Sequence, residues 1–461
     1  MNVENFALDG AVLAHDAVAD VLLPEFSEEA IALAFAERHK DDLRYVATWN
    51  RWLQWNGIKW VFDETYQAFD HAREVCRGFA DQAAREQDAR AAKQIARAQT
   101  VAAVLNLARA DRRIATVSQI WDANPMWLNT PGGIVDLASG TLIPHSPSFF
   151  MTKATTTAPG QDCPIWDQFI RRVTGGDDEL ACFLQRMAGY ALTGSTAEHA
   201  LFFLFGHGGN GKSVFLNTLS AIMGDYATTA AIETFTASTG EQHPTGLAAL
   251  RGARLVTSVE TEEGRRWAEA RIKTLTGGDP ISARFMRQDF FEFVPTFKLV
   301  IAGNHKPGLR SVDEAIRRRF HLIPFTVTIP AAERDPDLTQ KLKAEYGGIL
   351  RWMVDGALLW QERGLRPPAA VRAATDEYLT GEDALTAWAD ERCERTNVAW
   401  ESTSALYGSW KAWADASGEF AGSMKRFSQA MEAHGFVSER RRDGRGFFGL
   451  KLSTERWYER G

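Results

Sequence analysis

The stretch LFFLFGHGGNGKSVFLNTL, residues 201–219, places an apolar run before a glycine-rich loop and helical periodicity after it. The run 201–205 is short and continuous, which is typical of a strand buried on both faces of a parallel sheet. Residues 206–213 read GHGGNGKS and match the phosphate-loop pattern G-x-x-x-x-G-K-[ST]. Apolar side chains then return at helical spacing, at Val214, Phe215, Leu219 and Ile222. The stretch therefore predicts a strand, a phosphate-binding loop and a helix.

The residue types of the loop suit a nucleotide, and the flanking strand and helix argue against a chance match in a surface turn. Glycines let successive backbone N–H groups turn toward phosphate oxygens, and the following helix N-terminus adds partial positive charge. Lys212 can reach the β- and γ-phosphates, and the Ser213 hydroxyl can hold Mg²⁺. We therefore expect ATP and Mg²⁺ as cofactors. The expected nucleotide-binding residues are Gly206, His207, Gly208, Gly209, Asn210, Gly211, Lys212, Ser213 and Val214.

Length and composition indicate a globular chain of several domains. The 461 residues allow two to four domains, and 45% hydrophobic with 24% charged residues is an ordinary globular composition. No apolar run approaches the ~20 residues of a membrane helix, and the N-terminus has no signal-peptide pattern, so we expect no membrane association. The four cysteines lie far apart without a C-x-x-C pair, which argues against a zinc site or a disulfide framework and favours the cytoplasm. Because the net charge is −7, a nucleic-acid binder of this composition must concentrate its positive charge locally.

The order of patterns along the chain predicts five regions and an α/β fold class. Before the loop we expect a β-hairpin within 45–63, helices within 70–112 and short strands within 128–145. The tryptophans of the hairpin can stack on bases, although a small core is the commoner use. From 200 to 330, strands and helices alternate as in a doubly wound domain. The predicted regions are an N-terminal α+β domain (1–150), a linker (151–164), a P-loop ATPase domain (165–332), a helical lid (333–380) and a winged helix (381–461).

Two further strands are expected to end in catalytic side chains. The strand in ARLVTSVETEEG, 253–264, ends at Glu260, one strand over from the loop, where a carboxylate polarises attacking water and helps to organise Mg²⁺. Glu262 and Glu263 are lesser candidates, and a surface glutamate is the alternative. The strand in FKLVIAGNHKP, 297–307, ends at Asn304, whose amide can contact the γ-phosphate, although asparagine is also common before a turn.

A basic cluster follows in DEAIRRRFHLIPF, residues 313–325. One of its arginines can reach a neighbouring subunit's nucleotide as an arginine finger. We favour Arg319 and Arg318 over Arg317 for this role. The alternative is a solvated basic turn.

With these residues in place, the chain resembles the superfamily 3 helicases, in the phage and plasmid primase-helicase branch that is related to the poxvirus primase-helicase. The resemblance rests on GHGGNGKS, the strand ending in Glu260, the stretch 272–307 and RRRFHLIPF at 317–325, and it extends over roughly 30–455. It implies ring hexamers of AAA+-type domains with ATP between subunits. It also implies a hairpin from each subunit that enters the pore and tracks one DNA strand, 3′ to 5′.

Carried onto this sequence, the pore hairpin falls in Arg284 to Phe291 with Arg287 near its tip, and Lys273 lies just upstream. We expect Lys273, Arg284 and Arg287 to contact DNA phosphates, and an ordinary surface hairpin is the alternative. The second motif has one acid where related viral helicases carry two, so metal coordination rests on Ser213, with Glu260 acting mainly on water. Many relatives carry an N-terminal primase domain, and no paired-acid motif is evident here, so we expect a helicase without its own primase.

The C-terminal region reads as helices near 404–418 and 424–436 and a β-wing over 437–452. This suits a winged helix, which the resemblance also implies. The wing is locally positive, and its arginines can hold duplex phosphates. A protein-interaction wing is the alternative. The expected DNA contacts are Arg440, Arg441, Arg442 and Arg445, with Lys425 and Arg426 beside them.

These patterns favour a hexameric, ATP-driven replicative DNA helicase of a phage, prophage or plasmid, acting in the cytoplasm of a bacterial host. Its expected partners are single-stranded and forked DNA, copies of itself, and a separate primase or other replication proteins. One alternative is an ATP-gated DNA-binding initiator or loader. A third, weaker alternative is a DNA-translocating ATPase of defence or packaging.

Overall fold

The computed structural model describes residues 24–237, 245–260, 265–287, 289–309, 312–381, 384–419, 421–434, 436–441 and 444–453. These residues belong to two compact units. The first unit holds the residues up to Ala123 together with Ser146–Thr152, and the second holds Asn124–His145 together with the residues from Lys153 onward. No helix in the described ranges is both long and apolar enough to cross a membrane.

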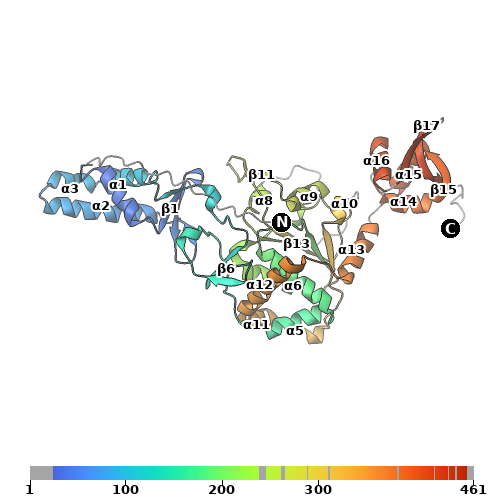
Figure 1. Ribbon diagram of the computed structural model, residues 1–461, viewed down its shortest axis with the longest axis horizontal. Coiled ribbons are helices and arrows are strands. Elements are labelled where there is room, and N and C mark those ends of the chain that lie inside the picture. Colours follow the sequence, from blue (N-terminus) through green and yellow to red (C-terminus); the bar gives the residue numbers. More distant parts are fainter. Residues whose placement is uncertain are drawn as a thin grey trace. The chain divides into compact units, whose positions relative to one another are not determined.

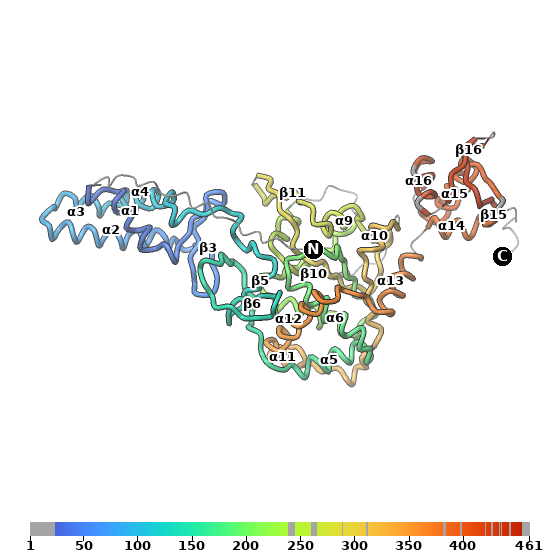
Figure 2. The backbone as a smooth tube through the Cα atoms, in the orientation of Figure 1, coloured from blue at the N-terminus to red at the C-terminus, as the bar shows by residue number. Residues whose placement is uncertain are grey.

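The first unit joins helices to a small sheet. Its elements are α1 (Glu28–Arg38), β1 (Leu43–Val46), β2 (Arg51–Trp55), β3 (Trp60–Phe62), α2 (Gln67–Arg85), α3 (Ala89–Ile95), α4 (Ala98–Ala108) and β4 (Ala115–Thr116). The sheet has the order β3-β2-β1-β4, with only β4 parallel to its neighbour. Helices α1, α2 and α4 share one apolar core. Figure 2 shows the three helices beside one another. The hairpin predicted within 45–63 and the helices predicted within 70–112 are confirmed.

The hairpin tryptophans contribute to a core. The β2–β3 turn contains Gly57 at φ 94°, and Trp55 faces Trp60 across the strands. Trp60 is 1% exposed, packs with Leu53 and Trp121, and donates its indole N–H to the carbonyl of Pro147 at 2.9 Å. For Trp60 the core role is therefore confirmed, because its ring is enclosed and its polar atom is satisfied.

The second unit is built on a five-stranded parallel sheet. Its strands are β8 (Leu201–Phe205), β9 (Ala227–Thr229), β10 (Leu255–Glu260), β13 (Lys298–Gly303) and β14 (Phe320–Pro324). They lie in the order β14-β8-β13-β10-β9, and every neighbouring pair is parallel. In chain order this is 5-1-4-3-2, so β8 lies inside the sheet between β14 and β13.

Helices cover both faces of this sheet (Figure 1). They are α5 (Pro164–Val173), α6 (Asp178–Leu192), α7 (Lys212–Met223), α8 (Thr245–Ala248), α9 (Glu269–Gly277), α10 (Glu314–Arg317), α11 (Leu338–Ala344), α12 (Tyr346–Arg363) and α13 (Ala369–Gly381). Alternate side chains of β8 divide between two cores. Phe202 and Leu204 pack with α5, α6, α7 and α12, whereas Leu201 and Phe203 pack with α9 and α13. The predicted α/β class, with a strand at 201–205 buried on both faces, is confirmed.

A small antiparallel sheet from 124–145 belongs to the second unit. Its strands are β5 (Trp127–Thr130), β6 (Gly133–Asp136) and β7 (Thr141–Ile143). Leu128 and Val135 join the core formed with α6 and α12, and the guanidinium of Arg254 donates to the carbonyl of Trp127 at 2.7 Å. The short strands were predicted, but the chain divides elsewhere than at residue 150. These strands complete the sheet-bearing unit because they have no separate core of their own.

Two smaller assemblies complete the second unit. The strands β11 (Ile281–Ala283) and β12 (Phe291–Phe293) form an antiparallel hairpin. At the C-terminal end the elements are α14 (Ala384–Arg392), β15 (Cys393–Ser402), α15 (Thr403–Ser417), α16 (Met424–Ala433), β16 (Val437–Arg441) and β17 (Gly444–Leu452). Here the sheet has the order β15-β17-β16, and Trp388, Phe427 and Leu450 are buried between it and the helices. The sequence analysis predicted these helices and the ribbon but not β15, whose CERTNVAWES run lacks a clean apolar alternation.

Candidate nucleotide-binding site

The loop 206–211 joins the carboxyl end of β8 to the first turn of α7. Gly211 precedes α7 with φ 89°, and a Cβ at this position would lie 2.5 Å from a methyl carbon of Val173. Gly209 has φ 77°. Both positions need glycine, because side chains rarely adopt this backbone conformation. The helix N-terminus, with its free N–H groups, therefore opens directly onto the loop.

Lys212 carries a buried positive charge in this loop. The residue is 6% exposed. In the described chain its ammonium donates to neutral oxygens: the carbonyls of Gly206 and His207, the amide of Asn210 at 3.1 Å and the amide of Asn304 at 3.2 Å. Burial lowers the pKa of Lys212. A buried cation surrounded by neutral acceptors, beside free helix N–H groups, fits the phosphate group of a nucleotide.

The ends of β10 and β13 lie at the same edge of the sheet as the loop. Glu260 pairs in register with Gly303, so Glu260 and Asn304 end neighbouring strands. The prediction that the Glu260 strand lies one strand over from the loop is wrong, because β13 lies between β8 and β10. Asn304 therefore comes from the strand next to the loop strand, and the described backbone of Glu260 is one strand further. Glu262 and Glu263 lie outside the described residues.

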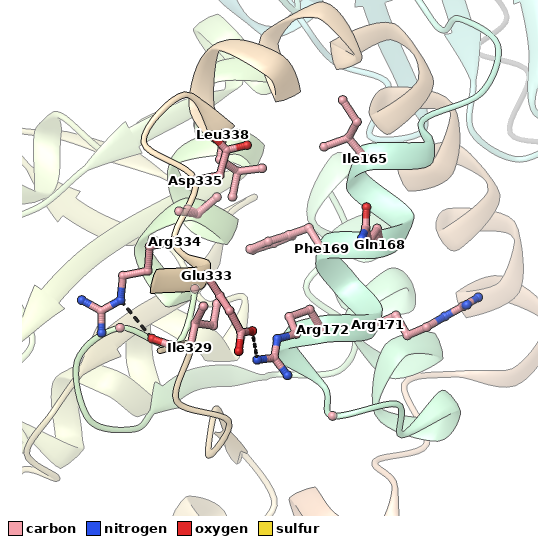
Figure 3. Close-up of a pocket in the computed structure, with 14 residues that line it drawn as sticks. Ile165, Gln168, Phe169, Arg171, Arg172, Ile329, Glu333, Arg334, Asp335 and Leu338 are labelled. Carbon is pink, nitrogen blue, oxygen red and sulfur yellow. Dashed lines mark hydrogen bonds and ion pairs between the residues drawn. The ribbon is translucent and has the colours of Figure 1, made fainter. Parts of the chain in front are cut away.

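A cavity of about 700 Å³ opens beside the loop (Figure 3). Gly209 and Gly211 line it on the loop side. Its apolar walls come from α5, α7, the segment after β14, and α11, through Ile165, Phe169, Val214, Ile329 and Leu338. Charged residues surround the opening, where Arg172 forms an ion pair with Glu333 at 2.5 Å. The cavity has the size and apolar lining of a small-ligand site and is continuous with the phosphate loop.

Sequence reasoning missed this cavity and Arg334. A Cβ placed on Gly209 would lie 2.3 Å from Nη2 of Arg334, and the Nε of Arg334 donates to the carbonyl of Ile329 at 3.0 Å. The guanidinium of Arg334 is therefore a second positive charge beside the loop, and it comes from the same chain. No local motif marks these residues, because the walls come from segments that are far apart in the sequence.

The three clustered arginines occupy different environments. Arg318 is exposed. Arg317 lies 3.9 Å from a carboxylate oxygen of Asp376. Arg319 is 6% exposed and donates to the hydroxyl of Thr276 at 3.2 Å and to the carbonyl of Ala315 at 2.7 Å. Burial and the neighbouring Arg318 lower the pKa of Arg319. Of the two favoured candidates, only Arg318 is free to reach outward in this conformation.

The β11–β12 hairpin presents the expected DNA-facing residues. Arg287 is exposed at its tip with φ 59°, and the guanidinium of Arg284 lies 4.8 Å from the ring centre of Phe290. Phe285 stacks on Phe291 at 5.5 Å, so aromatic rings brace the hairpin. Lys273 is engaged elsewhere, because its ammonium forms an ion pair with Asp313. A DNA contact by Lys273 would compete with that pair.

The C-terminal arginines lie on the ribbon β16–β17. Arg440 is exposed and faces Arg445 across the strands. Arg441 is exposed too, but its guanidinium lies 3.0 Å from the carboxylate of Glu439. Arg445 lies 3.2 Å from that of Glu432. Arg442 lies outside the described residues, as does the side chain of Arg426.

Two protein-family models match parts of the chain. The model described as D5 N terminal like matches residues 32–175. A family described as being of unknown function, DUF5906, matches residues 204–319, which include the phosphate loop and the hairpin.

Similar viral proteins carry provisional helicase names. Protein 022R of Frog virus 3 (isolate Goorha) is 24% identical over 260 residues, which is 52% of this chain and 27% of that protein. Protein L207/L206 of Acanthamoeba polyphaga mimivirus is 28% identical over 171 residues, which is 37% of this chain and 18% of that protein. The chain therefore matches about a quarter or less of the length of these relatives.

Solved structures share the fold. An apo structure of the NrS-1 C-terminal region has a TM-score of 0.52 and 9% identity, covering 92% of this chain and 99% of that one. A second, the A form, has a TM-score of 0.50 and 12% identity, covering 78% and 77%. In the two family matches, in the viral relatives and in this fold, the chain resembles the superfamily 3 helicases of the D5 type.

Proposed function

We propose that this chain is the motor of an ATP-dependent DNA helicase, and that it works as a ring hexamer moving 3′ to 5′ during replication of a phage, prophage or plasmid. The observation that carries the proposal is Lys212. It is a buried cation held by neutral oxygens of the loop and of Asn304, at an edge where three parallel strands end. The AAA+-type assignment is part of this proposal, and the strand order supports it.

The residues around Lys212 fit ATP with Mg²⁺. Hydrolysis of the nucleotide's phosphoanhydride bond supplies the energy for movement. Lys212 and the N–H groups of the loop would neutralise the phosphates, and the Ser213 hydroxyl would hold the metal ion. Glu260 would take the proton of the attacking water, and Asn304 would orient that water. The apolar cavity beside Gly209 would receive the base, with Arg334 beside the phosphates.

The proposed ring rests on an arginine from a neighbouring copy. Arg334 of the same chain lies at the loop, and Arg318 is exposed on a different segment. A neighbouring copy can bring its Arg318 to the nucleotide, which couples hydrolysis to assembly. The aromatic-braced hairpin with Arg287 at its tip would then contact the phosphates of one strand without reading its sequence.

The experiment is strand displacement on forked DNA with either a 3′ or a 5′ tail. We expect ATP-dependent displacement from the 3′ tail only, lost in Lys212→Ala and kept in Lys343→Ala, which changes an exposed lysine of α11. Displacement that survives Lys212→Ala would refute the assignment of this loop as the energy source.

One observation favours a second candidate, an ATP-gated initiator or loader. The C-terminal elements follow in the order helix, strand, helix, helix, strand, strand, which suits a winged helix, and Arg440 is exposed on its ribbon. Under this reading the chain binds duplex DNA when ATP is bound and does not unwind it. ATP-dependent binding at one duplex site, without displacement from either tail, would support the initiator instead of the helicase.

A further inference from the structure

Two histidines and two carboxylates meet where α1 ends beside α2 in the first unit. His39 follows the last residue of α1, Asp42 lies three residues later, and His71 and Glu74 lie on α2. The ring centres of His39 and His71 are 4.6 Å apart. His39 is 4% exposed, and His71 is half-buried. The cluster thus combines two elements that are distant in the sequence.

The hydrogen bonding of the two imidazoles is alike and incomplete. The Nδ1 of His39 lies 3.2 Å from both carboxylate oxygens of Asp42, and the Nδ1 of His71 lies 3.7 Å from the carboxylate of Glu74. The Nε2 atoms of both histidines are buried and have no hydrogen-bond partner in the described part of the chain. A buried polar nitrogen without a partner costs free energy, so the second nitrogen of each ring requires an explanation.

We propose that His39, His71 and Asp42 bind a divalent transition-metal ion of the zinc class. One ligand atom from each of the three residues can be chosen so that all lie within 4.8 Å of one another. Two imidazoles and one carboxylate form a donor set that zinc prefers. Only small movements of these three side chains would bring their ligand atoms to one metal ion. Glu74 beside His71 is the kind of outer carboxylate that orients a metal-bound imidazole.

The open ring nitrogens favour a metal ion. In the described part of the chain, the buried Nε2 atoms of both imidazoles lack a hydrogen-bond partner, and a metal ion would supply one. The cysteine spacing, which argued against a zinc site in the sequence, does not bear on a site made of histidine and aspartate.

The metal ion would hold the end of α1 to the N-terminal part of α2. The ring of His39 packs at a tilt against that of Phe35 of α1, whose side chain belongs to the core shared by α1, α2 and α4. A metal ion that binds the folded unit but not the unfolded chain raises the stability of this unit by mass action. We assign the ion a structural role, because its ligands lie at the end of α1 and on α2 and would join these two helices.

The test uses the full chain, stripped with a chelator, without nucleotide, and titrated with Co²⁺ or Zn²⁺ alone. We expect one equivalent of Co²⁺ with visible absorption bands of a low-coordinate ion, displaced by Zn²⁺. These bands should be lost in His71→Gln and kept in His145→Gln, which changes a histidine of the second unit. A hundredfold excess of Zn²⁺ over its dissociation constant should raise the unfolding midpoint of the first unit by roughly 5–10 °C in wild type.

A second variant guards against misfolding of His71→Gln. The side chain of Asp42 is 43% exposed, so Asp42→Asn should fold, and it should weaken the Co²⁺ affinity by roughly 10–100-fold. Equal metal affinity in wild type, His71→Gln and Asp42→Asn would overturn the proposal, as would the absence of any Zn²⁺-dependent rise in the unfolding midpoint. Metal that binds equally to all variants would belong to some other part of the chain.

Discussion

The ammonium of Lys212 lies 3.2 Å from the amide oxygen of Asn304, so a side chain of the phosphate loop meets the end of the neighbouring strand β13. Both residues come from the sheet edge where β8 and β13 end side by side. The amide oxygen occupies one of the positions around the ammonium that a phosphate oxygen can take. Arrival of an anion would therefore release Asn304 from Lys212 and leave its amide free to contact another group.

We expect Asn304→Ala to keep nucleotide affinity within about threefold and to lower the rate of ATP hydrolysis by about a hundredfold, near 2.7 kcal/mol of barrier. Asn304→Asp is the matched variant. Its carboxylate would pair with Lys212 and repel phosphate, so ATP binding itself should weaken. Fluorescent-nucleotide titration and steady-state ATPase assays measure the two effects. Loss of binding in Asn304→Ala would contradict the role given to the amide.

Substitution of Arg318 should affect ATP hydrolysis, whereas substitution of Arg319 should affect the stability of the fold. Arg318→Ala should abolish ATP hydrolysis in the assembled protein without changing its unfolding midpoint, because the side chain is exposed. Arg319→Ala should lower stability by roughly 1–3 kcal/mol, because it removes the hydrogen bonds to Thr276 and Ala315.

Mixing variants tests whether Arg318 acts between subunits. Lys212→Ala subunits retain Arg318, and Arg318→Ala subunits retain the loop. Each preparation alone should be inactive, and their mixture should regain ATP hydrolysis at the sites that combine an intact loop with an intact arginine. No recovery in mixed assemblies of confirmed composition would rule out a contribution in trans.

The apolar cavity beside the loop predicts a loss of nucleotide affinity when its wall is trimmed. Leu338→Ala should weaken ATP binding by about tenfold, since a buried contact of this size is worth roughly 1–2 kcal/mol. Leu358→Ala, at a half-buried leucine of α12 outside the cavity lining, is the control for general destabilisation. Calorimetric titration with a non-hydrolysable ATP analogue measures the affinity of each variant. Equal losses of affinity in the two variants would contradict the proposal that the cavity binds the base.

Arg287 at the hairpin tip should couple hydrolysis to DNA movement. Arg287→Ala should keep ATP binding and reduce strand displacement by at least about tenfold, because a phosphate contact at the tip is lost. Asp289→Asn changes an exposed charge of the same tip and should leave displacement near wild type. Normal strand displacement by Arg287→Ala would contradict the proposal that Arg287 contacts DNA during translocation.

His321 should make the second unit acid-sensitive. Its ring stacks on Phe202 at 5.4 Å, and burial lowers its pKa from 6.5 to about 4. Below pH 6.5 His321 takes up a proton in the unfolded chain but stays neutral in the folded chain. The free energy of unfolding therefore falls as the pH falls toward 4. From pH 7 to pH 5.5 this loss is about 1 kcal/mol. Calorimetric unfolding at the two pH values should show a smaller loss in His321→Gln, and an identical loss would point to other groups.

Local patterns predicted those elements whose signals lie within one stretch. The strand 201–205, the loop and α7 were predicted because glycine spacing and apolar periodicity coincide there. The hairpin within 45–63 was also predicted, because its strands and its turn lie within one short stretch. In contrast, β15 was missed, since its polar run gains strand structure only by pairing with β17.

Features that depend on tertiary packing could not be predicted. The strand order, with β13 between β8 and β10, is set by the packing of helices on both faces. The buried position of Arg319 includes a hydrogen bond to Thr276 of α9, which lies 43 positions earlier in the chain. The cavity is formed by α5, α7 and α11 together. The loop residues could therefore be predicted from the sequence, whereas the surrounding residues that select a ligand could not.

The chain crosses between the two compact units three times, after Ala123, after His145 and after Thr152. The middle excursion is the β5–β7 sheet, whose Leu128 and Val135 are anchored in the core with α6 and α12. A mechanical load on the first unit would therefore enter the second through three covalent connections rather than one flexible tether. The connection after Ala123 leads into β5, whose Leu128 is buried in that core, so a pull at this connection would be borne by packed structure.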